Sequence, residues 1–162
     1  MSLYLLSINE EKIILIPEEA IRIRVIANSN NENDIKIKEE LSKELNQEVE
    51  KIIIDSDNIN EAREKIENNY NFLTNYVEKK LNDFNYSKKF KINYGMNYFP
   101  EKIFHDVKYK EGYYESLVVT LGEGKGSNYW CVLYPPLCNI DDNNKIEYKF
   151  FVQEILNKYL KA

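Results

Sequence analysis

The period of the apolar residues changes near residue 88, and this change constrains the fold more than any other feature. Upstream of it, apolar residues recur at every third or fourth position, which is typical of amphipathic helices. The longest such stripe runs from Ile59 to Phe84, and Asp57 or Asn58 is its expected N-cap. Downstream, short segments rich in β-branched and aromatic residues predict strands. The chain should therefore combine helices and strands in an α+β fold.

The first elements of the chain are predicted as a strand and a helix. Residues 21–27 begin with alternating apolar and basic side chains and end fully apolar, which predicts a strand with a buried end. Ser29 and Glu32 have the spacing of a capping box, so a helix should follow from there. Its apolar residues recur at every fourth position from Ile37 to Val49. The apolar run at residues 52–54 is interpreted as a short strand.

The second half of the chain predicts three strands and a last helix. The strands are expected near residues 89–94, 115–121 and 129–134, and a short amphipathic helix holds residues 150–159. The prediction is thus α+β: a single domain with an N-terminal strand, two long helices, a mainly antiparallel sheet and a short C-terminal helix. The stripe at residues 59–84 should pack on that sheet, because it is short for a coiled coil.

Composition excludes several classes of protein. The chain has 162 residues, the size of one domain, and its 22 Lys and Arg against 27 Asp and Glu give a net charge of −5. That balance argues against nucleic-acid binding. With one His and two Cys, a zinc site of four nitrogen and sulfur ligands is hard to assemble. We expect no metal, no cofactor and no catalytic residue.

The N-terminus holds no complete membrane span or signal peptide. Two apolar stretches, Leu3–Leu6 and Ile13–Ile16, are separated by charged residues. Residues 1–16 are therefore interpreted as a leader or a truncated export segment, and residues 17–162 as the domain. The domain itself is not expected to insert stably into a membrane.

A glycine-rich loop, residues 122–126 (Gly-Glu-Gly-Lys-Gly), suggests phosphate binding. It does not match the P-loop pattern, because Lys125 precedes the last glycine where the pattern has the lysine after it. It does not match the dinucleotide fingerprint G-x-G-x-x-G either, because its third glycine comes one position early. A nucleotide-binding module that uses Gly122–Gly126 stays open as an alternative to a hairpin or a contact loop.

The two cysteines, Cys131 and Cys138, do not have zinc or thioredoxin spacing. They are either two buried thiols or a disulfide, depending on the compartment. A thiol hydrolase is a further alternative, with Cys131 as nucleophile, His105 as base and Asn128 or Asp106 as the orienting group. In a chain so rich in Asn, such a trio also occurs by chance.

An aromatic and proline-rich tract surrounds the first cysteine. It includes Tyr129, Trp130, Tyr134, Pro135 and Pro136, and Trp130 is the only tryptophan of the chain. Aromatic residues of this kind serve equally well in a core and as interface anchors. The sequence does not separate these two interpretations.

Residues 122–138, here called the signature tract, closely resemble the GEGxGxNWWCVLFPPLC pattern of the stage II sporulation protein R family of endospore-forming bacteria. Three further stretches agree: residues 16–29 resemble IPxxAIRLRVIANSD, residues 99–102 and 112–117 resemble FPxK and PAGEYEAL, and residues 149–152 resemble the start of KFFVxEW. The departures are Tyr129 for Trp, Tyr134 for Phe, and Lys110 and Glu111 for Pro-Ala. His105 stands where the family has Gly, which weakens the hydrolase interpretation.

The resemblance implies a secreted sporulation signal and no enzyme. Members of the family are made in the forespore and exported into the space between forespore and mother cell. There they activate a membrane-embedded sporulation aspartic protease of the mother cell, which removes the pro-segment of sigma-E. A location outside the cytosol favours a disulfide between Cys131 and Cys138. We expect the partner contact at Gly122, Gly124, Gly126, Asn128, Tyr129, Trp130, Tyr134, Pro135 and Pro136.

Overall fold

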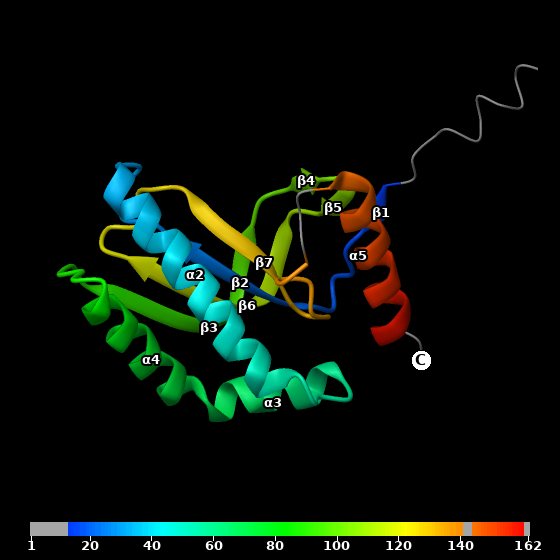
Figure 1. Ribbon diagram of the computed structural model, residues 1–162. Helices are drawn as coiled ribbons and strands as arrows, with labels where there is room; N and C mark the ends of the chain where they lie inside the picture. The colour runs from blue at the N-terminus through cyan, green and yellow to red at the C-terminus, as the bar shows by residue number, and fades with distance from the viewer. Residues whose placement is uncertain (1–12, 141–143, 161–162) are drawn as a thin grey trace, which may run out of the picture.

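The computed structural model describes residues 13–140 and 144–160 of the chain (Figure 1). In chain order, the elements are β1 (Ile14–Leu15), β2 (Ile21–Ile26), α2 (Glu32–Ile53), α3 (Ile59–Asn68), α4 (Tyr70–Asp83), β3 (Phe90–Phe99), β4 (Lys102–Phe104), β5 (Val107–Tyr109), β6 (Gly112–Leu121), β7 (Asn128–Tyr134) and α5 (Lys145–Tyr159). The α+β single domain is confirmed. Four of the five predicted strands correspond to β2, β3, β6 and β7, whereas β1, β4 and β5 are additional.

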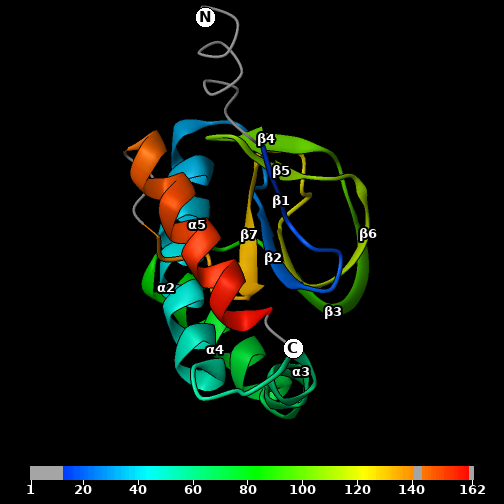
Figure 2. The ribbon, with the colours of Figure 1, turned by 90° about the vertical axis from the view of Figure 1, so that its right-hand side faces the viewer.

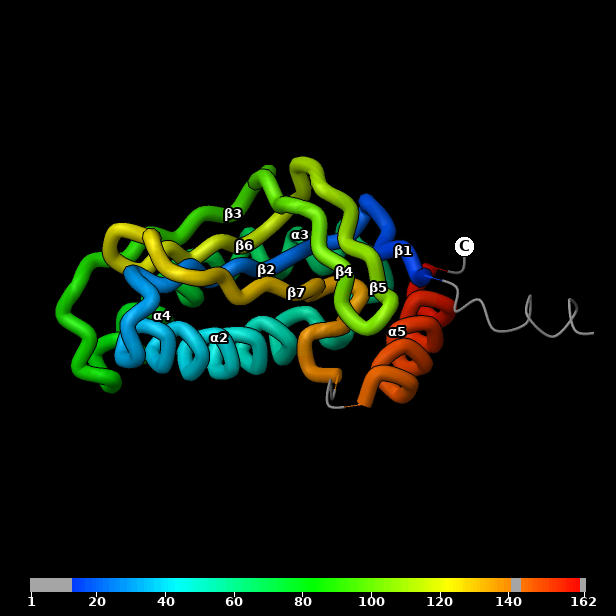
Figure 3. Tube along the Cα trace, turned by 90° about the horizontal axis from the view of Figure 1, so that it is seen from above, coloured from blue at the N-terminus to red at the C-terminus, as the bar shows by residue number. Residues whose placement is uncertain are grey.

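Two mixed sheets form the middle of the molecule. The larger sheet has the strand order β3-β6-β2-β7, and the smaller has the order β1-β5-β4. Three of the five strand pairs in the described residues are antiparallel, and β2 with β6 and β1 with β5 are parallel. The sheets are thus mainly antiparallel, as predicted. Helices α2 and α4 lie on one side of the larger sheet, and α5 lies at the end near β1 and β5 (Figures 2 and 3).

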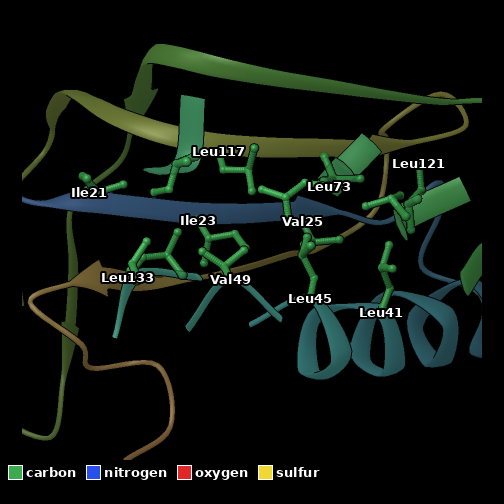
Figure 4. Packing of buried hydrophobic residues seen from close by; sticks show 14 of the residues in the cluster. Ile21, Ile23, Val25, Leu41, Leu45, Val49, Leu73, Leu117, Leu121 and Leu133 are labelled. Atoms are coloured by element: carbon green, nitrogen blue, oxygen red, sulfur yellow. The ribbon is translucent and has the colours of Figure 1, made fainter. Parts of the chain in front are cut away.

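The main core lies between the larger sheet and helices α2, α3 and α4 (Figure 4). Ile21, Ile23 and Val25 alternate along β2 and are fully buried, because side chains at every second position share one face of a strand. The apolar stripe of α2 packs against them, with Leu41 and Leu45 at zero exposure. The stripe at residues 59–84 joins the same core through Ala62 and Ile66 of α3 and Leu73, Val77 and Leu81 of α4, so its expected packing within the domain is correct.

The predicted strand at residues 52–54 is wrong. Helix α2 continues to Ile53, and Ile54 is its C-cap. Ile53 is buried one turn after Val49, whereas Ile54 is 61% exposed, so the run has the one-sided burial of a helix. Three consecutive isoleucines have no clear period of their own, and the helix period upstream decides their structure.

The helix ends also differ from the predictions. The capping box at Ser29 is wrong: the N-cap of α2 is Asn31, whose side-chain oxygen accepts the Asp34 N–H at 2.8 Å. The cap at Asn58 is confirmed, since its side chain accepts the Glu61 N–H at 2.9 Å. The expected second long helix is divided into α3 and α4 at Asn69, although its apolar stripe continues across the break.

A second core lies between the smaller sheet, the outer face of β7 and helix α5. It includes Ile16, Val107, Val132 and Val152, each at most 3% exposed. Strand β1 falls within the predicted leader, whereas Leu3–Leu6 lies outside the described residues. None of the described helices is long and apolar enough to span a bilayer.

Candidate functional site

The glycine loop crosses from β6 to β7 over the end of β2, so it is not a hairpin between paired strands. Each backbone N–H from residue 122 to residue 127 donates a hydrogen bond inside the protein. The acceptors are, in order, Lys89 O, Asn28 Oδ1, Leu121 O, Asn28 O, Ala27 O and Asn30 Oδ1. A phosphate-binding loop needs such donors directed at the ligand. In this structure, all six donors are used within the protein, and four of them hold the loop against residues 27–30.

Two of the glycines are required by this close approach. A Cβ atom on Gly126 would overlap the backbone carbonyl oxygen of Ser29, and one on Gly122 would overlap the Asn28 side chain. Gly122 also has a φ of +55°, in the left-handed region that favours glycine. Two stretches about a hundred residues apart thus form one structural unit, which we call the clamp: residues 27–31 and 122–127.

The buried carboxylate of Asp34, in the first turn of α2, stabilises the clamp. Asp34 accepts hydrogen bonds from Asn28 Nδ2 and Ser29 Oγ, both at 2.7 Å. The hydrogen bonds from Asn28 and then Ser29 lower the pKa of Asp34, because they favour the ionised form. Lys38, also buried, donates to Ser127 Oγ at 2.9 Å and links α2 to the loop.

The other end of the signature tract is a short cross-linked turn. The sulfur atoms of Cys131 and Cys138 lie at disulfide-bonding distance, with their Cα atoms 5.5 Å apart. The Leu137 N–H donates to the Val132 carbonyl oxygen at 3.1 Å and closes the turn. A cysteine in a disulfide has no thiolate, so the thiol hydrolase alternative would require reduction first.

Trp130 packs from β7 against a cluster of aromatic rings that the sequence did not reveal. We call this cluster, formed by Phe99, Tyr109 and Tyr114 around Arg22, the aromatic cage. The ring of Trp130 lies 5.5 Å from those of Phe99 and Tyr109, centroid to centroid. The fully buried guanidinium group of Arg22 lies among these rings, 3.6 Å from the centroid of Tyr114. Burial lowers the pKa of Arg22, and contact with aromatic faces offsets part of that cost.

A cavity of about 230 Å³ opens beside Trp130 and the cysteine pair. Phe104 of β4, Tyr109 and Tyr148 also line it. The hydroxyl groups of the two tyrosines are hydrogen-bonded to each other at 2.9 Å. Pockets for drug-sized ligands measure roughly 300–1,000 Å³. This cavity is therefore better suited to one inserted side chain than to a cofactor.

The residues of the predicted hydrolase trio have other roles here. His105 lies in the β4–β5 turn with a φ of +48°, and its ring packs on Phe104 with 4.0 Å between centroids. Asp106 forms ion pairs with Lys145 and Lys149 of α5, at 3.1 and 3.9 Å. The described residues contain no group of three His, Cys, Asp or Glu that could hold a metal ion.

The predicted contact residues differ in how far they reach the surface. Asn128 is exposed, and Tyr129, Trp130, Pro136 and the three loop glycines are half-buried. The Tyr129 hydroxyl accepts a hydrogen bond of 2.6 Å from the buried Asn46 side chain. Tyr134 and Pro135 are buried, and Tyr134 is only 6% exposed.

One known protein family matches most of the chain, including the signature tract. The model of the family described as stage II sporulation protein R matches residues 17–144. The chain belongs to this family. It is 32% identical over 136 residues to stage II sporulation protein R of Bacillus subtilis (strain 168), a match that covers 84% of the chain and 61% of that relative. The chain thus spans about three fifths of the curated protein, and no solved structure matches it.

Proposed function

We propose that this stage II sporulation protein R domain is an exported signal from the forespore. It binds a membrane-embedded sporulation aspartic protease of the mother cell and activates it, which leads to processing of pro-sigma-E. Membership of the family supports this role. The observation that carries the direct-binding mechanism is the cavity beside Trp130, Cys131 and Cys138, because the signature tract forms one of its walls.

The contact surface is narrower than the whole signature tract. Asn128, Tyr129 and Trp130 line the cavity and reach the surface, so they are proposed as contact residues. Tyr134 and Pro135 are buried and would act by shaping the cross-linked turn. Gly122, Gly124 and Gly126 belong to the clamp and would position β7, while Pro136 is half-buried and does not line this cavity.

The chemistry of the tract supports a binding role and gives no support to a catalytic one. Cys131 lies at bonding distance from Cys138, and the loop N–H groups are hydrogen-bonded within the protein. A disulfide at this position agrees with the proposed location outside the cytosol, between the two cells.

The test is reconstitution in a bacterium that does not sporulate. The chain, fused to a working export signal, is co-expressed with the cognate protease and its pro-sigma substrate, and cleavage is measured by immunoblot. We expect cleavage that depends on the chain. Absence of cleavage, with the exported chain shown to be folded, would contradict the signalling role.

Variants of Trp130 then test the contact surface. Trp130→Ala should abolish cleavage, and Trp130→Phe should restore part of it, because a ring still fills the cage beside Arg22. Met96→Ala is the matched control, since Met96 is 65% exposed on β3. Full activation by a folded Trp130→Ala protein would show that Trp130 is not an anchor.

A further inference from the structure

Exposed apolar side chains gather around β1 and α5, away from the signature tract. Twelve large hydrophobic side chains are exposed in the described residues, and six of them lie in these two elements or directly beside them. These six are Ile13, Leu15, Ile146, Phe150, Phe151 and Leu160. A cluster of this kind is unusual for a surface that faces only water, and it indicates an interaction site.

A groove runs between β1 and α5, which lie side by side in Figures 1 and 3. It consists of two adjoining hollows of about 520 and 450 Å³, which share Ile14 and Gln153 as lining residues. Phe150 lines the first hollow, and Leu160 lines the second. Five of the six exposed apolar side chains, all except Phe151, thus line one of these two adjoining hollows.

One wall of this groove is an open strand edge. Strand β1 is the outermost strand of the smaller sheet and pairs only with β5 among the described strands. The N–H groups of Ile14 and Ile16 donate to the carbonyl oxygens of Asp106 and Lys108, at 2.8 and 3.0 Å. Because alternate residues of a strand direct their amide groups to opposite sides, the N–H and C=O of Leu15 point away from β5. Leu15 also lines the groove.

The charged residues that line the groove are Lys145, Lys149 and Asp106, and Asp106 forms ion pairs with both lysines. The two lysines against the one carboxylate leave a net positive charge, although the chain as a whole carries −5. The occupant should therefore combine apolar side chains with acidic ones, since complementary charge favours the correct partner and register.

We propose that this groove binds an extended segment of a partner protein, which adds to the free edge of β1 as a further strand. Its backbone pairs with Leu15, its apolar side chains pack against Phe150 and Ile146, and an acidic side chain lies near Lys145 and Lys149. Strand addition of this kind takes affinity from backbone hydrogen bonds and specificity from alternate side chains. The identity of the partner as the sporulation protease rests on the proposed function above.

The direct test uses overlapping twelve-residue peptides that cover the outward-facing loops of the cognate protease, with binding followed by fluorescence anisotropy. The decisive variant is Leu15→Pro, which removes the outward N–H and leaves the bonds of Ile14 and Ile16 to β5 in place. Leu15→Val, which keeps the N–H, is its control. A peptide with apolar residues and at least one acidic residue should bind, and Leu15→Pro should weaken it about tenfold or more. If no loop peptide binds, or if Leu15→Pro binds as well as Leu15→Val, the proposal is wrong.

A second pair of variants guards against misfolding of Leu15→Pro. Phe150→Ser removes a groove side chain, whereas Phe151→Ser changes a neighbour on α5 that does not line either hollow. Both side chains are substantially exposed, so both variants should fold. Only Phe150→Ser should lose peptide binding, and equal binding by both variants would refute the role of Phe150.

The reconstituted cleavage assay separates the two proposals. If the parent chain activates the protease and the groove variants activate it equally well, the groove proposal fails and the signalling role stands. If the parent chain does not activate the protease but a loop peptide binds through Leu15, the signalling role fails and the groove proposal stands. Both proposals are supported if the parent chain and the controls Leu15→Val and Phe151→Ser activate the protease, whereas Leu15→Pro and Phe150→Ser do not.

Discussion

The two parts of the signature tract, the loop before β7 and β7 with the turn that follows it, have different structures. In the first part, every backbone N–H from residue 122 to residue 127 is hydrogen-bonded within the protein. After the clamp, β7 and the cysteine pair border a cavity of about 230 Å³, which Trp130 lines. A continuous motif therefore combines a part that fixes the strand with a part that is available to a partner. Substitutions in the two parts should separate stability from activation.

The largest loss of stability is expected at the clamp. Gly126→Ala forces a Cβ atom onto the Ser29 carbonyl oxygen, which cannot move without shifting the backbone of the clamp. We expect the free energy of unfolding to fall by about 2–3 kcal/mol, measured by urea denaturation. Gly95→Ala is the control, because its Cβ would have only the Asn93 side chain nearby, at 3.8 Å. Equal stability of the two variants would contradict the clamp.

The cysteine pair should have the next largest effect, at the other end of β7. Replacing both Cys131 and Cys138 with Ser removes a short closed loop, which should lower the free energy of unfolding by about 2 kcal/mol. A reducing agent should destabilise the parent chain by a similar amount and leave the double variant unchanged. If the parent chain is insensitive to reduction, the two thiols are not joined in solution.

Acid should weaken the clamp through Asp34. The folded-state pKa of Asp34 is lowered by its hydrogen bonds from Asn28 and Ser29, so its contribution is complete above the unfolded value of about 4. It is lost as the pH falls through the folded-state pKa. Asp34→Asn should therefore cost about 1–2 kcal/mol at neutral pH and less at pH 2–3.

The control for this prediction is a carboxylate outside the clamp. Glu115 accepts from Arg63 and Tyr94, and these hydrogen bonds outweigh the effect of burial and lower its pKa. Glu115→Gln should keep the Asp34 contribution to the acid dependence, measured by denaturation at a series of pH values. A pH dependence in Asp34→Asn identical to that of the parent would exclude Asp34 as its source.

Local patterns were enough to predict the larger elements and some of their ends. The alternation in residues 21–27 predicted β2, and Asn58 was one of two expected caps, because side-chain capping is a contact between near neighbours. Strands β1, β4 and β5 have two or three residues each, too few to show a period. The parallel pairing of β2 with β6 joins segments about ninety residues apart, and no local pattern encodes it.

The candidate site was predictable only in part, for a similar reason. The sequence pointed to Trp130 and to the cysteines, because their residue types are rare and specific. The alternating apolar and basic side chains of β2 gave no sign that Arg22 is fully buried, because the second core that covers this face comes from distant segments. The clamp was also missed, since the acceptors of the loop N–H groups lie on distant residues such as Asn28. Side chains that meet across such distances are determined by topology.

The smallest change in stability is expected at Lys102, on the rim of the cavity. Its ammonium group lies 5.0 Å from the ring centroid of Trp130, and an exposed cation–π contact contributes about 0.5–1 kcal/mol. Lys102→Met keeps the length of the side chain, so the free energy of unfolding should fall by less than about 1 kcal/mol.

If the partner inserts into this cavity, cleavage by the protease in the reconstituted assay should decrease far more in Lys102→Met than the free energy of unfolding does. The clamp variant Gly126→Ala should show the opposite pattern at low temperature, with reduced stability and retained cleavage. A Lys102→Met protein with unchanged cleavage would move the contact away from this rim and leave the groove between β1 and α5 as the remaining candidate surface.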